Sequence, residues 1–204
     1  MPKQIDVSSH NGSVDFSKMQ NVDFVFIRAT IGMGTVDKML PIHAAAAAAA
    51  GKQIGYYHFP YMHSGVDVVE DATKQANFFL ETIAPQPAFI HLAADCEEYD
   101  DKNLPTSDEH LSADNFELWL KTFFEVIEAQ TGNKEFLYSY RDYLDRKLNP
   151  EHGLGVQPLW LASYTGEPHK PRGWDTIKLW QYSEKGDAPD VPRTDIDVSR
   201  WVQS

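Results

Sequence analysis

The sequence predicts an α/β domain whose strands close into an irregular barrel. Three observations lead to this fold class. Short β-type apolar runs recur along the chain, helical patterns separate the earlier runs, and the connections in the last third lack a helical period. Strands that alternate with helices imply parallel pairing through right-handed crossovers, and eight such strands favour a closed barrel over an open sheet. The expected strands cover residues 5–8, 24–30, 54–59, 88–95, 136–140, 159–162, 177–182 and 196–199.

Helical patterns lie between several of these strands. The first covers residues 40–50, where seven consecutive alanines favour a helix and Gly51 suits its C-terminal cap. The second begins near Asp67, with Glu70 in the capping-box position, and ends before Pro85.

Two further helices follow. Apolar residues at helical spacing predict a third helix from about Ser112 until Gly132, and a shorter one covers 141–148. After Ala162 the connections are rich in Pro, Gly and charge, so the last three strands should lack crossover helices.

Length and charge limit the classes of function. With 204 residues and no linker or internal repeat, the chain is expected to form one domain over residues 1–204. The formal net charge of −12, without a Lys/Arg cluster, argues against nucleic acid as a partner and against adsorption to an anionic membrane. No apolar run reaches transmembrane length, and residues 1–4 lead directly into a strand rather than into a signal peptide.

Two carboxylates one residue apart, Asp95 and Glu97, close the fourth expected strand. Because side chains alternate along a strand, both should project the same way, and Cys96 between them should turn away as a buried structural thiol. Such a pair can hold one carboxyl protonated and the other ionised near neutrality, as acid-assisted cleavage of a glycosidic bond requires. Solvated acids at this spacing are also common, so the rest of the chain has to decide.

Other polar residues fall at the strand ends, where parallel barrels place their chemistry. Four carboxylates from three strands are expected to converge, with aromatic rings that could stack on sugars and amides that could bond their hydroxyl and acetamido groups. Metal binding is the competing interpretation, but no EF-hand-like spacing or ligating His pair is present, so we expect no metal and no cofactor. The expected site contains Asp6, Asp95, Glu97 and Asp197 as acids, with Arg28, Tyr57, His58, Tyr138, Trp160 and Gln181 around them.

The order and spacing of many short motifs identify a family resemblance. The chain resembles the glycoside hydrolase family 25 lysozymes, the muramidases of phage lysins, bacteria and fungi, over nearly its whole length. The matching segments are IDVS at 5–8, FIRAT at 26–30, GYYHF at 55–59, QANFFL at 75–80, the DCE motif at 95–97, LYS at 137–139, LWLASY at 159–164, LWQY at 179–182 and IDVS at 196–199.

The resemblance implies an irregular TIM-like barrel of five β/α units followed by three strands that largely lack helices. It also implies hydrolysis of the β-1,4 bond between N-acetylmuramic acid and N-acetylglucosamine in bacterial peptidoglycan, with Glu97 as general acid and Asp95 as its partner. Asp6 and Asp197 match the other two acidic positions of the family, and Asp197 fits better than nearby Asp195.

Further consequences of the resemblance concern the environment in which the protein acts. We expect a monomer that acts on the cell wall or outside the producing cell, either secreted or released at lysis. The family usually has a lysine where this chain has Arg28, whose planar fork of donors could change the substrate contacts.

Two alternative functions remain at this point. A chitinase-like hydrolase of N-acetylglucosamine polymers also uses carboxylates at i and i+2, together with the acetamido group of its substrate. A non-catalytic glycan-binding barrel is the other alternative, although that function does not require the four acids that this chain retains.

Overall fold

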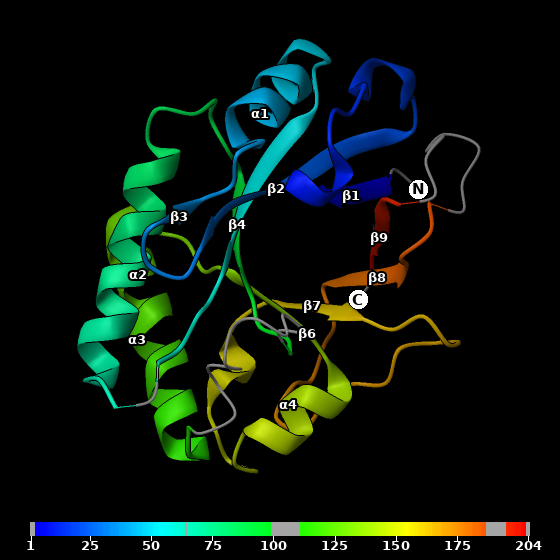
Figure 1. Ribbon diagram of the computed structural model, residues 1–204. Coiled ribbons are helices and arrows are strands. Elements are labelled where there is room, and N and C mark those ends of the chain that lie inside the picture. The colour runs from blue at the N-terminus through cyan, green and yellow to red at the C-terminus, as the bar shows by residue number, and fades with distance from the viewer. Residues whose placement is uncertain (1–2, 64, 99–110, 187–194, 203–204) are drawn as a thin grey trace.

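The computed structural model describes residues 3–63, 65–98, 111–186 and 195–202. Its strands form one sheet in the order β1-β9-β8-β7-β6-β5-β4-β2-β3, and β1 also pairs with β2, which closes eight strands into a barrel (Figure 1). The α/β barrel predicted from the sequence is confirmed. The strands are β1 (Lys3–Val7), β2 (Val22–Ile31), β3 (Thr35–Val36), β4 (Gln53–Phe59), β5 (His91–Asp95), β6 (Phe136–Tyr140), β7 (Leu159–Ala162), β8 (Leu179–Ser183) and β9 (Asp197–Trp201).

The direction of the last strand differs from the expectation. Neighbouring strands from β1 through β8 around the barrel are parallel, but β9 runs antiparallel to both β8 and β1. The beginning of β9 therefore lies at the same edge as the ends of the other strands. One short strand was not predicted. This strand, β3, forms a hairpin with the end of β2 outside the closed barrel.

Four α-helices follow the predicted positions closely. They are α1 (Leu40–Ala49), α2 (Val68–Ile83), α3 (Ala113–Thr131) and α4 (Arg141–Lys147). The Asp67 side chain accepts the amide of Glu70 at the start of α2, and Ser112 accepts that of Asn115 at the start of α3. Three short 3-10 turns, η1 (Ser9–Asn11), η2 (Phe16–Lys18) and η3 (Leu154–Val156), complete the described elements.

The helices cover only part of the barrel wall. In Figure 1, α2 and α3 pack side by side on the side of the barrel opposite β8 and β9. No α-helix among the described residues follows β7, β8 or β9, as the composition of the last third predicted. No described helix is long and apolar enough to cross a membrane.

Side-chain alternation divides the core into two layers. The residues that fill the barrel interior are mostly aromatic, and the ring of Phe26 stacks on Trp160 at 4.4 Å between centroids. Gly55 faces this layer, and a Cβ there would come within 2.7 Å of the rings of Phe24 and Phe26. The second layer lies between the sheet and the helices and contains Cys96, which is buried as expected. The interior is thus a packed core that supports the end of the barrel where the strands carry polar residues.

Candidate functional site

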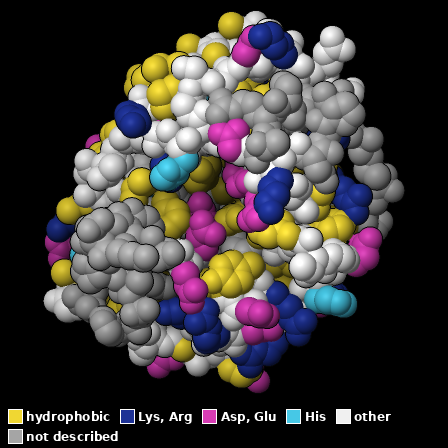
Figure 2. All heavy atoms as spheres, turned by 45° about the vertical axis from the view of Figure 1, so that its right-hand side comes forward, with side chains coloured by type: hydrophobic (Ala, Val, Ile, Leu, Met, Phe, Trp, Pro, Cys, Tyr) yellow, Lys and Arg dark blue, Asp and Glu magenta, His cyan; other side chains and the backbone are white. Residues whose placement is uncertain are grey.

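A hollow of about 470 Å³ opens at the edge of the barrel where the parallel strands end. Figure 2 shows acidic side chains gathered in a hollow on this face, with hydrophobic side chains around them. The described residues that line it are Asp6, Val7, Ser8, His10, Asn11, Arg28, Tyr57, Phe59, Asp95, Glu97, Glu98, Tyr138, Trp160, Asp195 and Asp197. All four acids predicted for the site therefore lie in one hollow.

The strands explain how these four acids meet. Asp95 is the last residue of β5, and Glu97 lies two residues beyond it on the same side. Asp6 of β1 is paired with Asp197 of β9 in the antiparallel register. Asp197 is the first residue of its strand, so the expectation that it stands at a strand's C-terminal end is wrong. It reaches the hollow because β9 runs in the opposite direction.

Burial and mutual repulsion make these carboxyls weak acids. Burial is the main cause that raises the pKa of Glu97 to about 7, and the charge of Asp197 is the second. Burial and the charge of Glu184 raise the pKa of Asp197 to about 6. For Asp6 and Asp95, burial and neighbouring carboxylates raise the pKa well above the ordinary aspartate value. The site can therefore hold protons near neutrality, which ordinary surface carboxylates cannot do.

Gln181 lies beneath the acids and is fully buried. Its Nε2 donates to Oδ2 of Asp6 at 2.9 Å, and its Oε1 accepts the hydroxyls of Tyr138 at 2.8 Å and Tyr164 at 2.6 Å. The prediction placed Gln181 against the substrate, but it is absent from the described residues that line the hollow. Its contacts instead fix the positions of an acid and two phenols.

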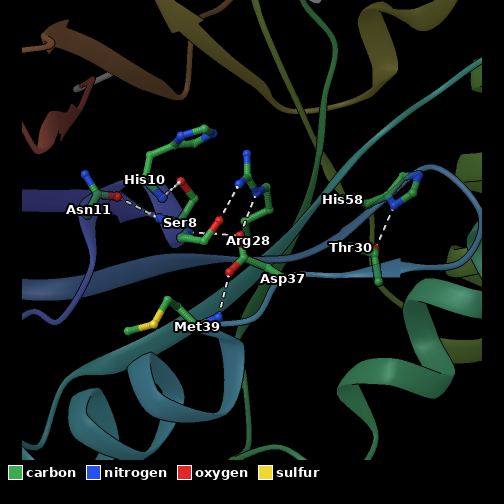
Figure 3. Close-up of polar contacts among 9 residues, drawn as sticks. Ser8, His10, Asn11, Arg28, Thr30, Asp37, Met39 and His58 are labelled. Carbon is green, nitrogen blue, oxygen red and sulfur yellow. Dashed lines mark hydrogen bonds and ion pairs between the residues drawn. The ribbon is translucent and has the colours of Figure 1, made fainter. Parts of the chain in front are cut away.

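Arg28 is the only Lys or Arg among the described residues that line the hollow. Its Nε donates to Oδ2 of Asp37 at 2.8 Å, and its Nη2 donates to Oγ of Ser9 at 3.1 Å (Figure 3). Burial raises the pKa of Asp37, but the amides of Ser9 and Met39 and the guanidinium outweigh it and lower the pKa below the ordinary value. Asp37 is therefore an ionised anchor for Arg28. The charge of Arg28 opposes the rise in pKa that burial and neighbouring carboxylates cause at Glu97 and Asp95.

A second hollow of about 580 Å³ adjoins the first, and Glu97 and Tyr138 line both. Its other described lining residues are Tyr140, Arg141, Asp142, Leu161, Ala162, Ser163, Tyr164, Thr165, His169 and Glu184. The predicted site did not include these ten residues, and half of them lie after strand ends in segments without a periodic pattern. Glu97 thus stands where two compartments meet, as a residue acting on a bond between two bound groups must.

His58 is not part of either hollow, and its prediction as a substrate contact is wrong. Its side chain has 0% exposure and packs between the sheet and the helices, where it stacks on Phe123. Its Nδ1 hydrogen-bonds Thr30 Oγ1 at 2.8 Å and its Nε2 hydrogen-bonds Gln75 Oε1 at 3.0 Å. Strand alternation is the reason: Tyr57 points into the barrel, so its neighbour His58 points out.

The three predicted aromatic residues form part of the wall of the first hollow and are also held by the core beneath it. Tyr57, Tyr138 and Trp160 line the first hollow, although each is largely buried. Trp160 donates its Nε1 proton to Ser199 Oγ at 3.0 Å, so its indole edge is fixed from below. Among the described residues, no group of three or more His, Cys, Asp or Glu side chains is arranged to hold a metal ion.

Comparisons with known proteins agree with this fold and with the sequence motifs. The sequence profile of glycosyl hydrolases family 25 matches residues 5–191. The autolytic lysozyme of Clostridium acetobutylicum is 29% identical over 90% of this chain and 51% of its own length. Lysozyme M1 of Streptomyces globisporus is 26% identical over 97% of this chain and 66% of its own length. The chain thus spans about half to two thirds of these relatives.

A solved structure provides the same comparison at the level of the fold. The bacterial lysozyme from Streptomyces coelicolor superposes with a TM-score of 0.85 at 23% identity, covering 100% of this chain and 93% of the other. At that identity the likeness concerns the barrel itself. The family match and the four acids together supply the basis for assigning a reaction.

Proposed function

Because the chain belongs to glycosyl hydrolases family 25, we propose that it is a muramidase, a lysozyme that hydrolyses the β-1,4 bond between N-acetylmuramic acid and N-acetylglucosamine in peptidoglycan. The single observation that carries this proposal is the position of Glu97 at the junction of two hollows, beside three further carboxyls. Its substrate is bacterial cell-wall peptidoglycan, so it acts on the wall or outside the producing cell, as a monomer. The match to lysozymes of two bacterial genera supports this assignment.

Glu97 is assigned the role of general acid. A carboxyl with a pKa of about 7 is protonated in about half of the molecules at pH 7, and the protonated form can deliver its proton to the leaving glycosidic oxygen. Asp95 stands two residues earlier on the same side of the chain, with Oδ1 buried and without a hydrogen-bond partner among the described residues. The part of the Asp95 carboxyl that lines the hollow can orient the substrate's acetamido N–H.

The positively charged centre that develops on the sugar needs a nucleophile. The proposal favours the acetamido oxygen of the substrate itself, oriented by Asp95 with Tyr138 nearby, which gives net retention of configuration. Direct attack by a carboxylate or by an activated water is the alternative. Burial and the surrounding carboxyls raise the pKa of Asp95 well above the ordinary value, so it is a poor anionic nucleophile at neutral pH.

Product analysis tests the reaction class. Purified peptidoglycan is digested with the wild-type protein, with Glu97→Gln and with Glu125→Gln, an exposed glutamate on α3 that serves as the matched control. After borohydride reduction, mass spectrometry identifies the sugar at the new reducing end. Muramitol supports the proposal, N-acetylglucosaminitol supports the chitinase-like alternative, and the absence of products supports a glycan-binding barrel. Undiminished release by Glu97→Gln contradicts its role as the acid.

A further inference from the structure

Arg28 is held so that one of its nitrogens stays unused. Nε and Nη2 are engaged by Asp37 and Ser9, and Figure 3 shows both contacts on the same side of the guanidinium. Nη1 has no hydrogen-bond partner among the described residues and is not among their buried unpartnered atoms. Because Arg28 is 8% exposed and lines the first hollow, this accessible nitrogen faces the hollow.

The anchor of Arg28 is rigid. Asp37 is 3% exposed, and its two oxygens also accept the amides of Ser9 at 3.0 Å and Met39 at 2.9 Å. A guanidinium fixed at two of its three nitrogens cannot turn, so the direction of the Nη1 protons is set before a ligand arrives. A lysine ammonium carries its three donors on one atom at the end of a flexible stem, so it lacks the planar fork that Asp37 and Ser9 hold here.

The charge of the hollow gives this donor its significance. Asp6, Asp95, Glu97, Glu98, Asp195 and Asp197 line the same space, and among its described residues Arg28 is the only Lys or Arg. The ionised members of this lining repel an anionic group on a ligand, and Arg28 is the lining residue among those described that attracts one. In the glycan strand itself, muramic acid carries an acidic substituent, the 3-O-lactyl group, whereas N-acetylglucosamine carries none.

We propose that Arg28, held in place by Asp37 and Ser9, receives the lactyl group of the muramic acid residue at Nη1 and thereby determines which of the two sugars occupies the first hollow. In strands that carry stem peptides, the same position presents an amide carbonyl, which accepts the same N–H without the charge. This inference rests on the proposed muramidase function and adds the group of the substrate that is recognised.

Two forms of one substrate test the inference. Glycan strands freed of stem peptides by an amidase carry lactyl carboxylates, and methyl esterification of the same strands removes the charge and keeps the carbonyl. The ratio of kcat/KM for the two forms is measured for the wild type and for variants. This ratio cancels any effect that a variant has equally on both forms, including a loss of folded protein or a change in the acidity of Glu97.

The expected result is a preference whose sign depends on Arg28. The wild type prefers the carboxylate form by about tenfold, as one charge-assisted hydrogen bond allows. In Arg28→Gln the preference reverses to the ester, because only the acidic lining remains. Ser9→Ala, which frees Nη2, reduces the wild-type ratio by about threefold. Lys38→Gln removes an exposed positive charge next to Asp37 without touching the guanidinium, so its ratio equals that of the wild type.

Each contrary result has a distinct meaning. A wild type that cuts both forms equally, or an Arg28→Gln variant that still prefers the carboxylate, overturns the inference and leaves the muramidase function standing. A ratio in Lys38→Gln that changes as much as in Arg28→Gln also overturns it, because overall charge would then be the cause. A wild type that cuts intact peptidoglycan but neither form requires the stem peptide for recognition, which overturns the inference. Failure on intact peptidoglycan as well overturns the proposed function, on which the inference rests.

Discussion

Asp6 and Asp197 lie opposite each other across the antiparallel pair of β1 and β9, at the hollow that Glu97 also lines. Burial and the charge of Asp197 raise the pKa of Asp6 well above the ordinary aspartate value, because two neighbouring carboxylates repel each other. The amide of Gln181 donates to Oδ2 of Asp6 and so fixes the orientation of this carboxyl.

The contacts of Gln181 predict the effect of replacing it. In Gln181→Met, Asp6 loses its donor and two phenols lose their shared acceptor, so we expect kcat to fall about 10- to 100-fold through displaced groups. The free energy of unfolding should fall by about 1–3 kcal/mol for buried polar groups left unpaired. Steady-state kinetics and urea unfolding measure both quantities. Gln157→Met is the matched control, because the buried Oε1 of Gln157 has no described partner and its removal should cost little.

The acidity of Glu97 predicts the pH dependence of activity. A general acid acts when protonated, so kcat/KM should be constant below a pKa of about 7 and fall tenfold per pH unit well above it. Arg28 lowers this pKa, so Arg28→Gln should move the alkaline limb to higher pH. A pH profile of both proteins on soluble glycan strands measures the limb. An alkaline limb near pH 4 to 5 in the wild type would show that an ordinary carboxyl governs the reaction.

The position of His58 predicts a structural role. Burial lowers its pKa to about 3, so the ring is neutral, and Nδ1 depends on the Thr30 hydroxyl for its hydrogen bond. Thr30→Val keeps the shape and leaves this nitrogen unpaired, which should lower the free energy of unfolding by about 1–3 kcal/mol. Because His58 lines neither described hollow, KM should not change. A tenfold rise in KM with unchanged stability would restore His58 as a substrate contact.

Glu135 predicts a loss of stability at alkaline pH that is separate from catalysis. It is 2% exposed just before β6, and burial raises its pKa to about 8. A carboxyl with a raised folded-state pKa contributes its full stability below its unfolded value, and this contribution is lost as the pH rises to about 8. Glu135→Gln should therefore remove about 3–5 kcal/mol of pH dependence, with equal stability of the two proteins at pH 4.

Thermal unfolding at several pH values from 4 to 9 measures this difference. Glu125→Gln, on the exposed face of α3, removes the same charge without removing a buried one and should keep the wild-type pH profile. Parallel profiles for the wild type and Glu135→Gln would mean that Glu135 does not titrate on folding.

Local sequence signals predicted most elements, and their physical basis explains why. The cap residues Ser112 and Gly132 gave the ends of α3 because their roles depend on neighbouring backbone atoms alone. The direction of β9 could not be predicted, since alternation and apolar content are the same for a strand read either way. The short β3 was also missed, because a two-residue strand has too little pattern to recognise.

The candidate site was predicted as a set of residues more accurately than as a set of contacts. Strand ends correctly brought Asp6, Asp95, Glu97 and Asp197 together, because barrel topology fixes where strand ends meet. The roles of Asp37, Gln181 and Tyr164 depend on side chains from distant strands and loops, which no local pattern encodes. The prediction that His58 contacts substrate was wrong because only one face of a strand end points into the hollow, and His58 lies on the other face.

Closure of the barrel between β1 and β9 makes the hollow depend on a strand that is synthesised long after its partner. During translation, β1 emerges with one of its two neighbours, β9, still nearly two hundred residues away. Until β9 leaves the ribosome, the nascent chain has neither the strand that seals the sheet nor the acid that pairs with Asp6. A chain cut short before β9 therefore lacks both the strand that closes the sheet and one of the four carboxyls that meet in the hollow.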